Sequence, residues 1–326
     1  MRTIQFRDAL REAMNEEMRR DDRVFLMGEE VAEYNGAYKV SQGMLDEFGA
    51  DRIIDTPIAE LGFTGIGVGA AMNGLRPIVE FMTWNFAILA ADQIINSAAK
   101  MLQMSGGQYN VPIVFRGGNG TAGQLAATHS QSFEAFYAHV PGLKVLTPSN
   151  PADAKGLLRS AIADDDPVIY LENKKITFRK GEVPEGDYRI ALGEASVARS
   201  GSDVSLITYS VMAQHALEAA QVLFEEHSVE AEVVDLRTLV PLDIESVLTS
   251  VAKTRRAVIC HEAWTFGGFG AEISSQINEH LFGELAAPVV RVGARSAPIP
   301  FSPPLERELV PEASEVVEAV LRTVKL

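Results

Sequence analysis

The chain has one cysteine, a shortage of positive charge and no long apolar run. The single cysteine, Cys260, excludes an internal disulfide and a cysteine-rich zinc site, and it fits a reducing compartment. With 29 Lys and Arg against 44 Asp and Glu, the formal net charge of −15 argues against nucleic acid and against a polybasic membrane contact. No apolar run is long enough to span a membrane without interruption. We therefore expect an acidic globular protein with neither nucleic acid nor membrane as a partner.

The amino-terminal stretch also lacks the apolar core of a secretory signal. Its apolar residues recur at helical spacing, which predicts a packed amphipathic helix instead (Ile4, Phe6, Leu10, Met14 and Met18). We expect a cytoplasmic protein without a targeting segment.

Apolar strands alternate with amphipathic helices along the 326 residues, which favours parallel sheets with helices on both faces. Residues 86–104 are predicted as one long helix that ends before Gly106-Gly107. A charged, turn-rich segment with Gly181, Pro184 and Gly186 interrupts the alternation. We predict an α/β protein with two doubly wound domains, a first domain at 1–180, a linker at 181–194 and a smaller second domain at 195–326.

The stretch 55–74 carries the strongest candidate for chemistry. Glu60 follows a short strand and Pro57, and after it the chain has no charge until Arg76. Gly65 and Gly69 lie four residues apart in this run, which allows another backbone to approach closely. A carboxyl desolvated beside such an interface can hold or release a proton near neutral pH. A first-turn acid that satisfies free backbone NH groups explains Glu60 equally well.

Three other segments carry candidate site residues. His129 lies on a loop after a strand and suits proton delivery, although a histidine bonded to its own loop backbone is the simpler interpretation. The segment 81–86, which contains Met82 and Phe86, suits either core packing or a slot for a flat heteroaromatic ligand. Residues 164–166 are three aspartates that form a solvated turn or offer carbonyl ligands to a hard cation.

Two motifs point to functions that the surrounding sequence disfavours. The loop Gly118-Asn119-Gly120-Thr121-Ala122-Gly123 matches the dinucleotide fingerprint, but the next strand ends at Thr147-Pro148 without the acid that binds a ribose. His261-Glu262 has no second histidine at the spacing of a zinc protease, so we interpret it as polar structure at a strand end.

Several long stretches occur in the order known from one enzyme family. They are the run 55–107, then VPIVFRGGNG, HSQSFEAFYAHVPGLKVLTPSNPADAKGLL, VVDLRTLVPLD and HEAWTFGGFGAEI. With them, almost the whole chain resembles the beta subunits of the thiamine-diphosphate-dependent 2-oxo acid dehydrogenases. EFMTWNFA followed by INSAAK is more similar to the pyruvate branch, and a branched-chain 2-oxo acid or acetoin dehydrogenase is the alternative.

The resemblance implies a transketolase-like fold, with a pyrimidine-binding domain followed by a transketolase C-terminal-like domain, and thiamine diphosphate as cofactor. Glu60 matches the glutamate that bonds to N1′ of the aminopyrimidine ring and so promotes loss of the thiazolium C2 proton. Phe86 matches the aromatic residue that packs on this ring, and Met82 lies at a matching nearby position. His129 matches the histidine that helps to pass the acetyl group to lipoamide.

The resemblance also implies a structural potassium ion, bound mostly through carbonyl oxygens. The matching positions are Ile113, Ala161, Ile162, Asp164 and Asp166.

The chain lacks the GDG motif with which relatives hold the divalent metal and the diphosphate. We therefore expect a separate pyruvate dehydrogenase alpha subunit to hold magnesium in an α2β2 heterotetramer, with the glycine-rich helix after Glu60 at a subunit contact. The acetyl acceptor would be the lipoyl group of a dihydrolipoyl acetyltransferase core. Many relatives carry an acid where this chain has Arg295-Ser296, so the usual docking geometry on that core is in doubt. The terminal carboxylate of Leu326 is another contact for a basic partner.

Overall fold

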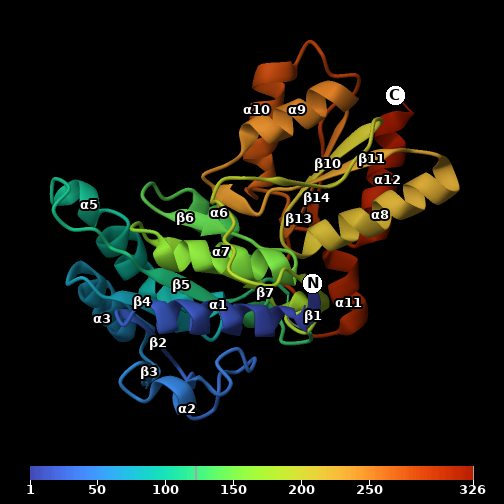
Figure 1. Ribbon diagram of the computed structural model, residues 1–326. Coiled ribbons are helices and arrows are strands. Elements are labelled where there is room, and N and C mark those ends of the chain that lie inside the picture. Colours follow the sequence, from blue (N-terminus) through green and yellow to red (C-terminus); the bar gives the residue numbers. More distant parts are fainter. Residues whose placement is uncertain (122, 326) are drawn as a thin grey trace. The chain divides into compact units, whose positions relative to one another are not determined.

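The structure is a computed structural model that describes residues 1–121 and 123–325, and it divides into two compact units (Figure 1). Unit 1 consists of Met1–Asn119 and Phe136–Leu192, and unit 2 of Gly120–Ala135 and Gly193–Leu326. Residues 120–135 thus group with unit 2, although they interrupt unit 1 in the sequence. Leu326, predicted as a docking carboxylate, lies outside the described residues, as does Ala122 of the glycine-rich loop.

Unit 1 is built on a parallel sheet in the order β6-β7-β5-β4-β2-β3. Its strands are β2 (Val24–Gly28), β3 (Ile53–Asp55), β4 (Arg76–Phe81), β5 (Val114–Asn119), β6 (Lys144–Leu146) and β7 (Val168–Asn173). A separate antiparallel pair joins β1 (Arg2–Gln5) to β8 (Lys180–Val183). The central strands β5 and β7 are buried along their whole length, and β4 is buried beyond Arg76, which explains their largely apolar runs.

The helices of unit 1 follow the strands in alternation. They are α1 (Phe6–Arg20), α2 (Met44–Phe48), α3 (Glu60–Met72), α4 (Trp84–Ala87), η1 (Ile88–Ala90), η2 (Gln93–Ala98), α5 (Met101–Met104), α7 (Pro151–Ala163) and η4 (Lys174–Ile176), while α6 (Glu134–Ala138) begins in unit 2. A Cβ on Gly67 would lie 2.8 Å from Cγ2 of Val79, so this glycine lets α3 lie directly against β4. The single helix predicted over 86–104 is wrong, because a 3₁₀ turn and a π-helix divide it into shorter pieces.

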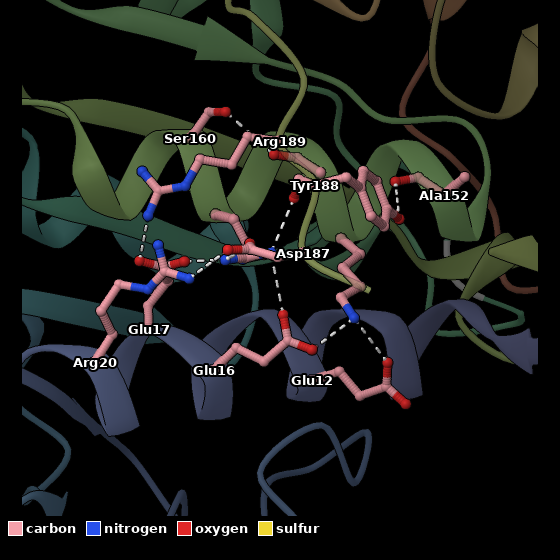
Figure 2. Close-up of polar contacts among 12 residues, drawn as sticks. Glu12, Glu16, Glu17, Arg20, Ala152, Ser160, Asp187, Tyr188 and Arg189 are labelled. Atoms are coloured by element: carbon pink, nitrogen blue, oxygen red, sulfur yellow. Dashed lines mark hydrogen bonds and ion pairs between the residues drawn. The ribbon is translucent and has the colours of Figure 1, made fainter. Parts of the chain in front are cut away.

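Residues 184–192, here called the strap, contact both α1 and α7 through hydrogen bonds and ion pairs (Figure 2). Buried Arg159 of α7 binds Glu17 of α1 at 2.8 Å and donates to the carbonyl of Tyr188 at 2.9 Å, and it also pairs with Asp187. Arg189 reaches the other oxygen of Glu17 at 2.6 Å. The charged residues that predicted a linker therefore form specific contacts within unit 1.

Unit 2 has a second sheet in the order β14-β13-β10-β11-β9, in which only β9 runs antiparallel. Its strands are β9 (Ser196–Arg199), β10 (Val204–Thr208), β11 (Ala231–Asp235), β13 (Ala257–Trp264) and β14 (Val290–Ala294). The short strand β12 (Thr238–Val240) is not part of this sheet. Its helices are η3 (Ala127–His129), α8 (Val211–His227), α9 (Ile244–Thr254), α10 (Gly270–Leu281), α11 (Pro303–Leu309) and α12 (Ala313–Val324). The predicted α/β class is confirmed in both units. No helix in the described ranges combines the length and the apolar character of a membrane span.

Candidate active site

The strand order of unit 1 reverses between β2 and β4. The chain passes from β2 to β3 on one side, and then crosses over β2 to form β4 on the other side. In open parallel sheets, ligands bind outside the carboxyl ends of strands at such a reversal. Glu29 directly follows β2, Met82 directly follows β4, and α3 of the crossover begins at Glu60.

Two buried carboxyl groups meet at this edge of the sheet. Glu29 is 5% exposed and Glu60 is 4% exposed, and the two carboxyl groups interact electrostatically. Burial, together with the smaller effect of the neighbouring Glu60 carboxyl group, raises the pKa of Glu29 from its ordinary 4.5 to about 7. Oε1 of Glu29 has no hydrogen-bond partner among the described residues. Glu29 therefore holds an exchangeable proton near neutral pH.

The position of Glu60 is compatible with both interpretations that the sequence left open, and the choice between them stays a prediction. It is the first residue of α3, where the helix dipole favours a negative charge, and it is also buried. Asp55, at the end of β3, accepts hydrogen bonds from the backbone of Ala32 at 2.7 Å and of Glu33 at 3.1 Å. These bonds fix the segment that follows Glu29, and so they help to hold the two carboxyl groups together.

The aromatic segment after β4 divides into a core part and an accessible part. Phe81 packs on Phe63 and Trp84 with ring centroids 5.8 and 5.4 Å apart, and all three are buried. Met82 and Phe86 remain half-buried on either side of Trp84. Phe81 and Trp84 therefore fill the core, while Met82 and Phe86 keep some exposed surface, so the ligand slot stays a prediction for these two residues.

Three charged residues of the central strands β4, β5 and β7 form a buried ionic triad. Arg116 of β5 pairs with Glu80 of β4 and Glu172 of β7, and all three side chains are buried. Burial raises the pKa of Glu80, and Arg116 opposes that shift. Sequence analysis did not single out these residues. The sequence feature that could have indicated them is a single charged residue within each of three otherwise uncharged strands, in PIVEF, VFRGGN and VIYLEN.

His129 belongs to unit 2, whereas Glu60, Met82 and Phe86 belong to unit 1. It ends the short helix η3, its backbone NH donates to the carbonyl of Ala126 at 3.2 Å, and its Nδ1 lies 3.0 Å from the hydroxyl of Thr128. The local hydrogen bonds expected of a loop histidine are therefore present. They leave the catalytic interpretation open.

Three of the five positions predicted to bind potassium contact cationic side chains of the protein (Ile162, Asp164 and Asp166). Arg76 donates to the carbonyl oxygens of Ile162 at 3.1 Å, Ala163 at 2.6 Å and Asp164 at 2.9 Å. Lys144 pairs with the carboxylates of Asp164 at 2.7 Å and Asp166 at 3.1 Å. The carbonyl of Ile113 accepts from Val168, and that of Ala161 accepts from Asp164. In the described ranges no three His, Cys, Asp or Glu side chains gather as a metal site. Potassium at these positions stays a prediction.

The raised pKa of Glu29 predicts a pH-dependent gain in stability from Glu29→Gln. The unfolded chain loses the Glu29 proton near pH 4.5 and the folded chain only near 7, so ionisation destabilises the fold increasingly across this range. Relative to the parent chain, the variant should gain up to about 3 kcal/mol in free energy of unfolding between pH 5 and pH 8. Urea unfolding at the two pH values measures this difference. Glu30→Gln changes an exposed neighbour and is the matched control; a Glu29→Gln gain that is equal at both pH values would contradict the expected titration.

Comparison with known proteins agrees with the fold. The protein family described as "Transketolase, pyrimidine binding domain" matches residues 2–178, and the family described as "Transketolase, C-terminal domain" matches residues 193–316. A solved structure titled "Split gene transketolase, inactive beta4 tetramer" superposes with a TM-score of 0.78 at 24% identity, covering 99% of both chains. A transketolase from Pichia stipitis superposes with a TM-score of 0.71 at 15% identity, over 99% of this chain and 46% of that one. The fold therefore defines a transketolase-like protein of the thiamine diphosphate class.

The curated relatives define the branch of that class. A "Pyruvate dehydrogenase E1 component subunit beta" from Rickettsia felis is 53% identical over 97% of each chain. The mitochondrial counterpart from Caenorhabditis elegans is 51% identical over 99% of this chain and 93% of its own length. The chain belongs to the family of pyruvate dehydrogenase E1 beta subunits. This membership implies thiamine diphosphate as cofactor and an alpha subunit as partner, and it favours the pyruvate branch over the branched-chain alternative.

Proposed function

We propose that the Glu29–Glu60 edge of unit 1 binds the aminopyrimidine ring of thiamine diphosphate. The observation that carries this proposal is the buried carboxyl pair at the point where the strand order reverses. The residues present fit the ring: a shielded carboxyl group suits a ring nitrogen, and half-buried Phe86 and Met82 suit its flat faces. When bound, thiamine diphosphate supplies the electron sink that decarboxylation of a 2-oxo acid requires.

In this proposal Glu60 binds the N1′ nitrogen, and Glu29 keeps a proton available beside it. Because the pKa of Glu29 is about 7, this carboxyl group can donate a proton to Glu60 or accept one from it during turnover at neutral pH. Buried surroundings keep the exchange away from bulk water. His129 has a separate task, which is to assist transfer of the acetyl group to the lipoyl group of a dihydrolipoyl acetyltransferase core.

The remaining parts of the site belong to the alpha subunit in this proposal. The sequence lacks GDG, which supports placing the magnesium ion and most diphosphate contacts on that subunit of an α2β2 heterotetramer. An exposed apolar surface on and beside α3 and η1 supports a subunit contact next to Glu60 (Ile58, Leu61, Ile66, Ile88 and Leu89). The proposal also includes a structural potassium ion and a cytoplasmic location. The positions expected to bind the ion are Ile113, Ala161, Ile162, Asp164 and Asp166.

Reconstitution tests this division of labour. The chain is expected to be inactive alone, and to decarboxylate pyruvate only with the alpha subunit, thiamine diphosphate and magnesium. Dye-coupled rates with pyruvate, 3-methyl-2-oxobutanoate and acetoin, measured on the chain alone and on the heterotetramer, provide the comparison. Appreciable pyruvate decarboxylation by the chain alone would refute the shared site, and a preference for either of the other substrates would contradict the pyruvate assignment.

A further inference from the structure

Residues 120–135, here called the His129 loop, are anchored to the sheet of unit 2 close to both of the loop's ends. The loop begins after Asn119 and ends in the first turn of α6. Both of its partners stand at the carboxyl edge of that sheet: Tyr209 directly follows β10, and Glu262 lies near the end of β13.

The first anchor joins Thr121 to Glu262. The carboxylate of Glu262 accepts from the backbone NH of Thr121 at 3.2 Å and from its hydroxyl group. Thr121 is 2% exposed and Glu262 is 6% exposed, so water competes little for either bond. Hydrogen bonds to a charged acceptor in such surroundings are among the stronger ones in proteins.

The second anchor joins Glu134 to Tyr209. The phenol of Tyr209 donates to the carboxylate of Glu134 at 3.2 Å, and both side chains are buried. Burial raises the pKa of Tyr209 far above its ordinary value, and the charge of Glu134 adds to this shift. Tyr209 therefore keeps its proton and remains a donor at any pH at which the enzyme works.

The buried ring of His261 packs against Tyr209 and directly precedes Glu262, so it helps to fix the position of both anchoring residues. Its ring is buried next to Glu262 in the sequence and stacks on Tyr209 at 6.2 Å between centroids with an interplanar angle of 5°. A Cβ on Gly268 or Gly270 would lie 2.7 or 2.6 Å from this ring, so the chain closes tightly around it. Burial lowers the pKa of His261 to about 4, so the ring is uncharged at neutral pH.

The loop between the anchors has a backbone that needs such restraint. Gln124 and Ala126 have positive φ angles of 66° and 64°, which cost free energy in residues that carry a side chain. Ala126 provides the carbonyl to which the NH of His129 donates, and Gly120 donates to the carbonyl of Gln131 at 3.0 Å. Strained backbone of this kind persists where surrounding contacts determine it.

We propose that Glu262 and Tyr209 are positioning residues that hold the His129 loop, and thereby His129, in the arrangement used for acetyl transfer. This proposal rests on the role proposed for His129. Glu262 bonds to the backbone NH and the hydroxyl group of Thr121, and Tyr209 bonds to the carboxylate of Glu134, so each of the two residues restrains one end of the loop.

Two conservative variants test the anchors in the reconstituted heterotetramer. Thr121→Val and Tyr209→Phe each remove one hydroxyl group and keep the shape of the side chain. Each should slow acetylation of a lipoyl domain about tenfold, while dye-coupled decarboxylation of pyruvate stays within about twofold. Thr254→Val is the matched control, because it removes a buried hydroxyl of α9 that bonds to Ser205 and lies outside the loop; it should leave the ratio of the two rates unchanged.

A double-mutant cycle with His129→Ala distinguishes failure of the positioning proposal from failure of the role proposed for His129. If the anchors act through His129, Thr121→Val and Tyr209→Phe should add no further loss in the His129→Ala background. Equal losses in both reactions, or an unchanged acetylation rate in both anchor variants, would overturn the positioning proposal while His129→Ala remains impaired. If His129→Ala itself acetylates the lipoyl domain at the parent rate, the proposed role of His129 fails first, and the positioning proposal fails with it.

Discussion

Glu60→Gln is expected to lower pyruvate decarboxylation by the heterotetramer by about three orders of magnitude. The glutamine side chain keeps the size of the glutamate but cannot exchange a proton with Glu29 or with a ring nitrogen. The loss should therefore appear in the rate of turnover, with the fold retained. Steady-state dye-coupled rates, measured with saturating thiamine diphosphate, report the effect.

The control for this experiment is Glu33→Gln, which makes the same change at an exposed position of the segment after Glu29. Assembly with the alpha subunit and the unfolding temperature should be the same in both variants as in the parent. Unchanged turnover in Glu60→Gln would instead support a different class of function, in which the chain is a catalytically silent scaffold between the alpha subunit and the acyltransferase core.

Arg116→Met is expected to destabilise the chain by about 3–5 kcal/mol. The substitution leaves Glu80 and Glu172 buried next to each other without the guanidinium group that pairs with both. Burial already raises the pKa of Glu80, and loss of Arg116 removes an opposing effect. Since a raised carboxyl pKa destabilises the fold as pH increases, the loss should be larger at pH 8 than at pH 5.

Urea unfolding of Arg116→Met at these two pH values measures the loss and its direction. Arg19→Met is the control, because the pair between Arg19 and Glu47 is exposed and screened by water. A combined variant that also carries Glu80→Gln and Glu172→Gln should recover part of the stability, since no carboxylate then remains unpaired. A loss in Arg116→Met that is no larger than in Arg19→Met would show that the triad adds little to the fold.

The sequence predicted the elements that depend on local pattern. The alternation of strands and helices predicted the α/β class, which the structure confirms, and the acid before an uncharged glycine-rich run pointed to Glu60, whose role stays a prediction. The resemblance gave the family, which the comparisons show. By contrast, the helix expected over 86–104 is divided, because its apolar spacing does not reveal the 3₁₀ and π-helical hydrogen bonds.

The residues that sequence analysis missed depend on pairing across the sheet. Glu29 stands beside a second acid, Glu30, and only the adjacency of β2 and β3 brings Glu29 to Glu60. The partners of Arg116 come from strands on either side of it, far apart in the chain. For the same reason, Glu262 looked like ordinary polar structure at a strand end, because its contact with Thr121 cannot be inferred from local spacing.

The strap affects how the protein can be cut into fragments. A truncation at Gly181, where the composition changes, would remove Asp187, which pairs with Arg159, and Arg189, which pairs with Glu17, and would leave only part of this buried ionic cluster in the fragment. Scission after Leu192 would spare them, but that fragment would carry residues 120–135 away from their own sheet. No single break in the polypeptide therefore yields two self-sufficient halves.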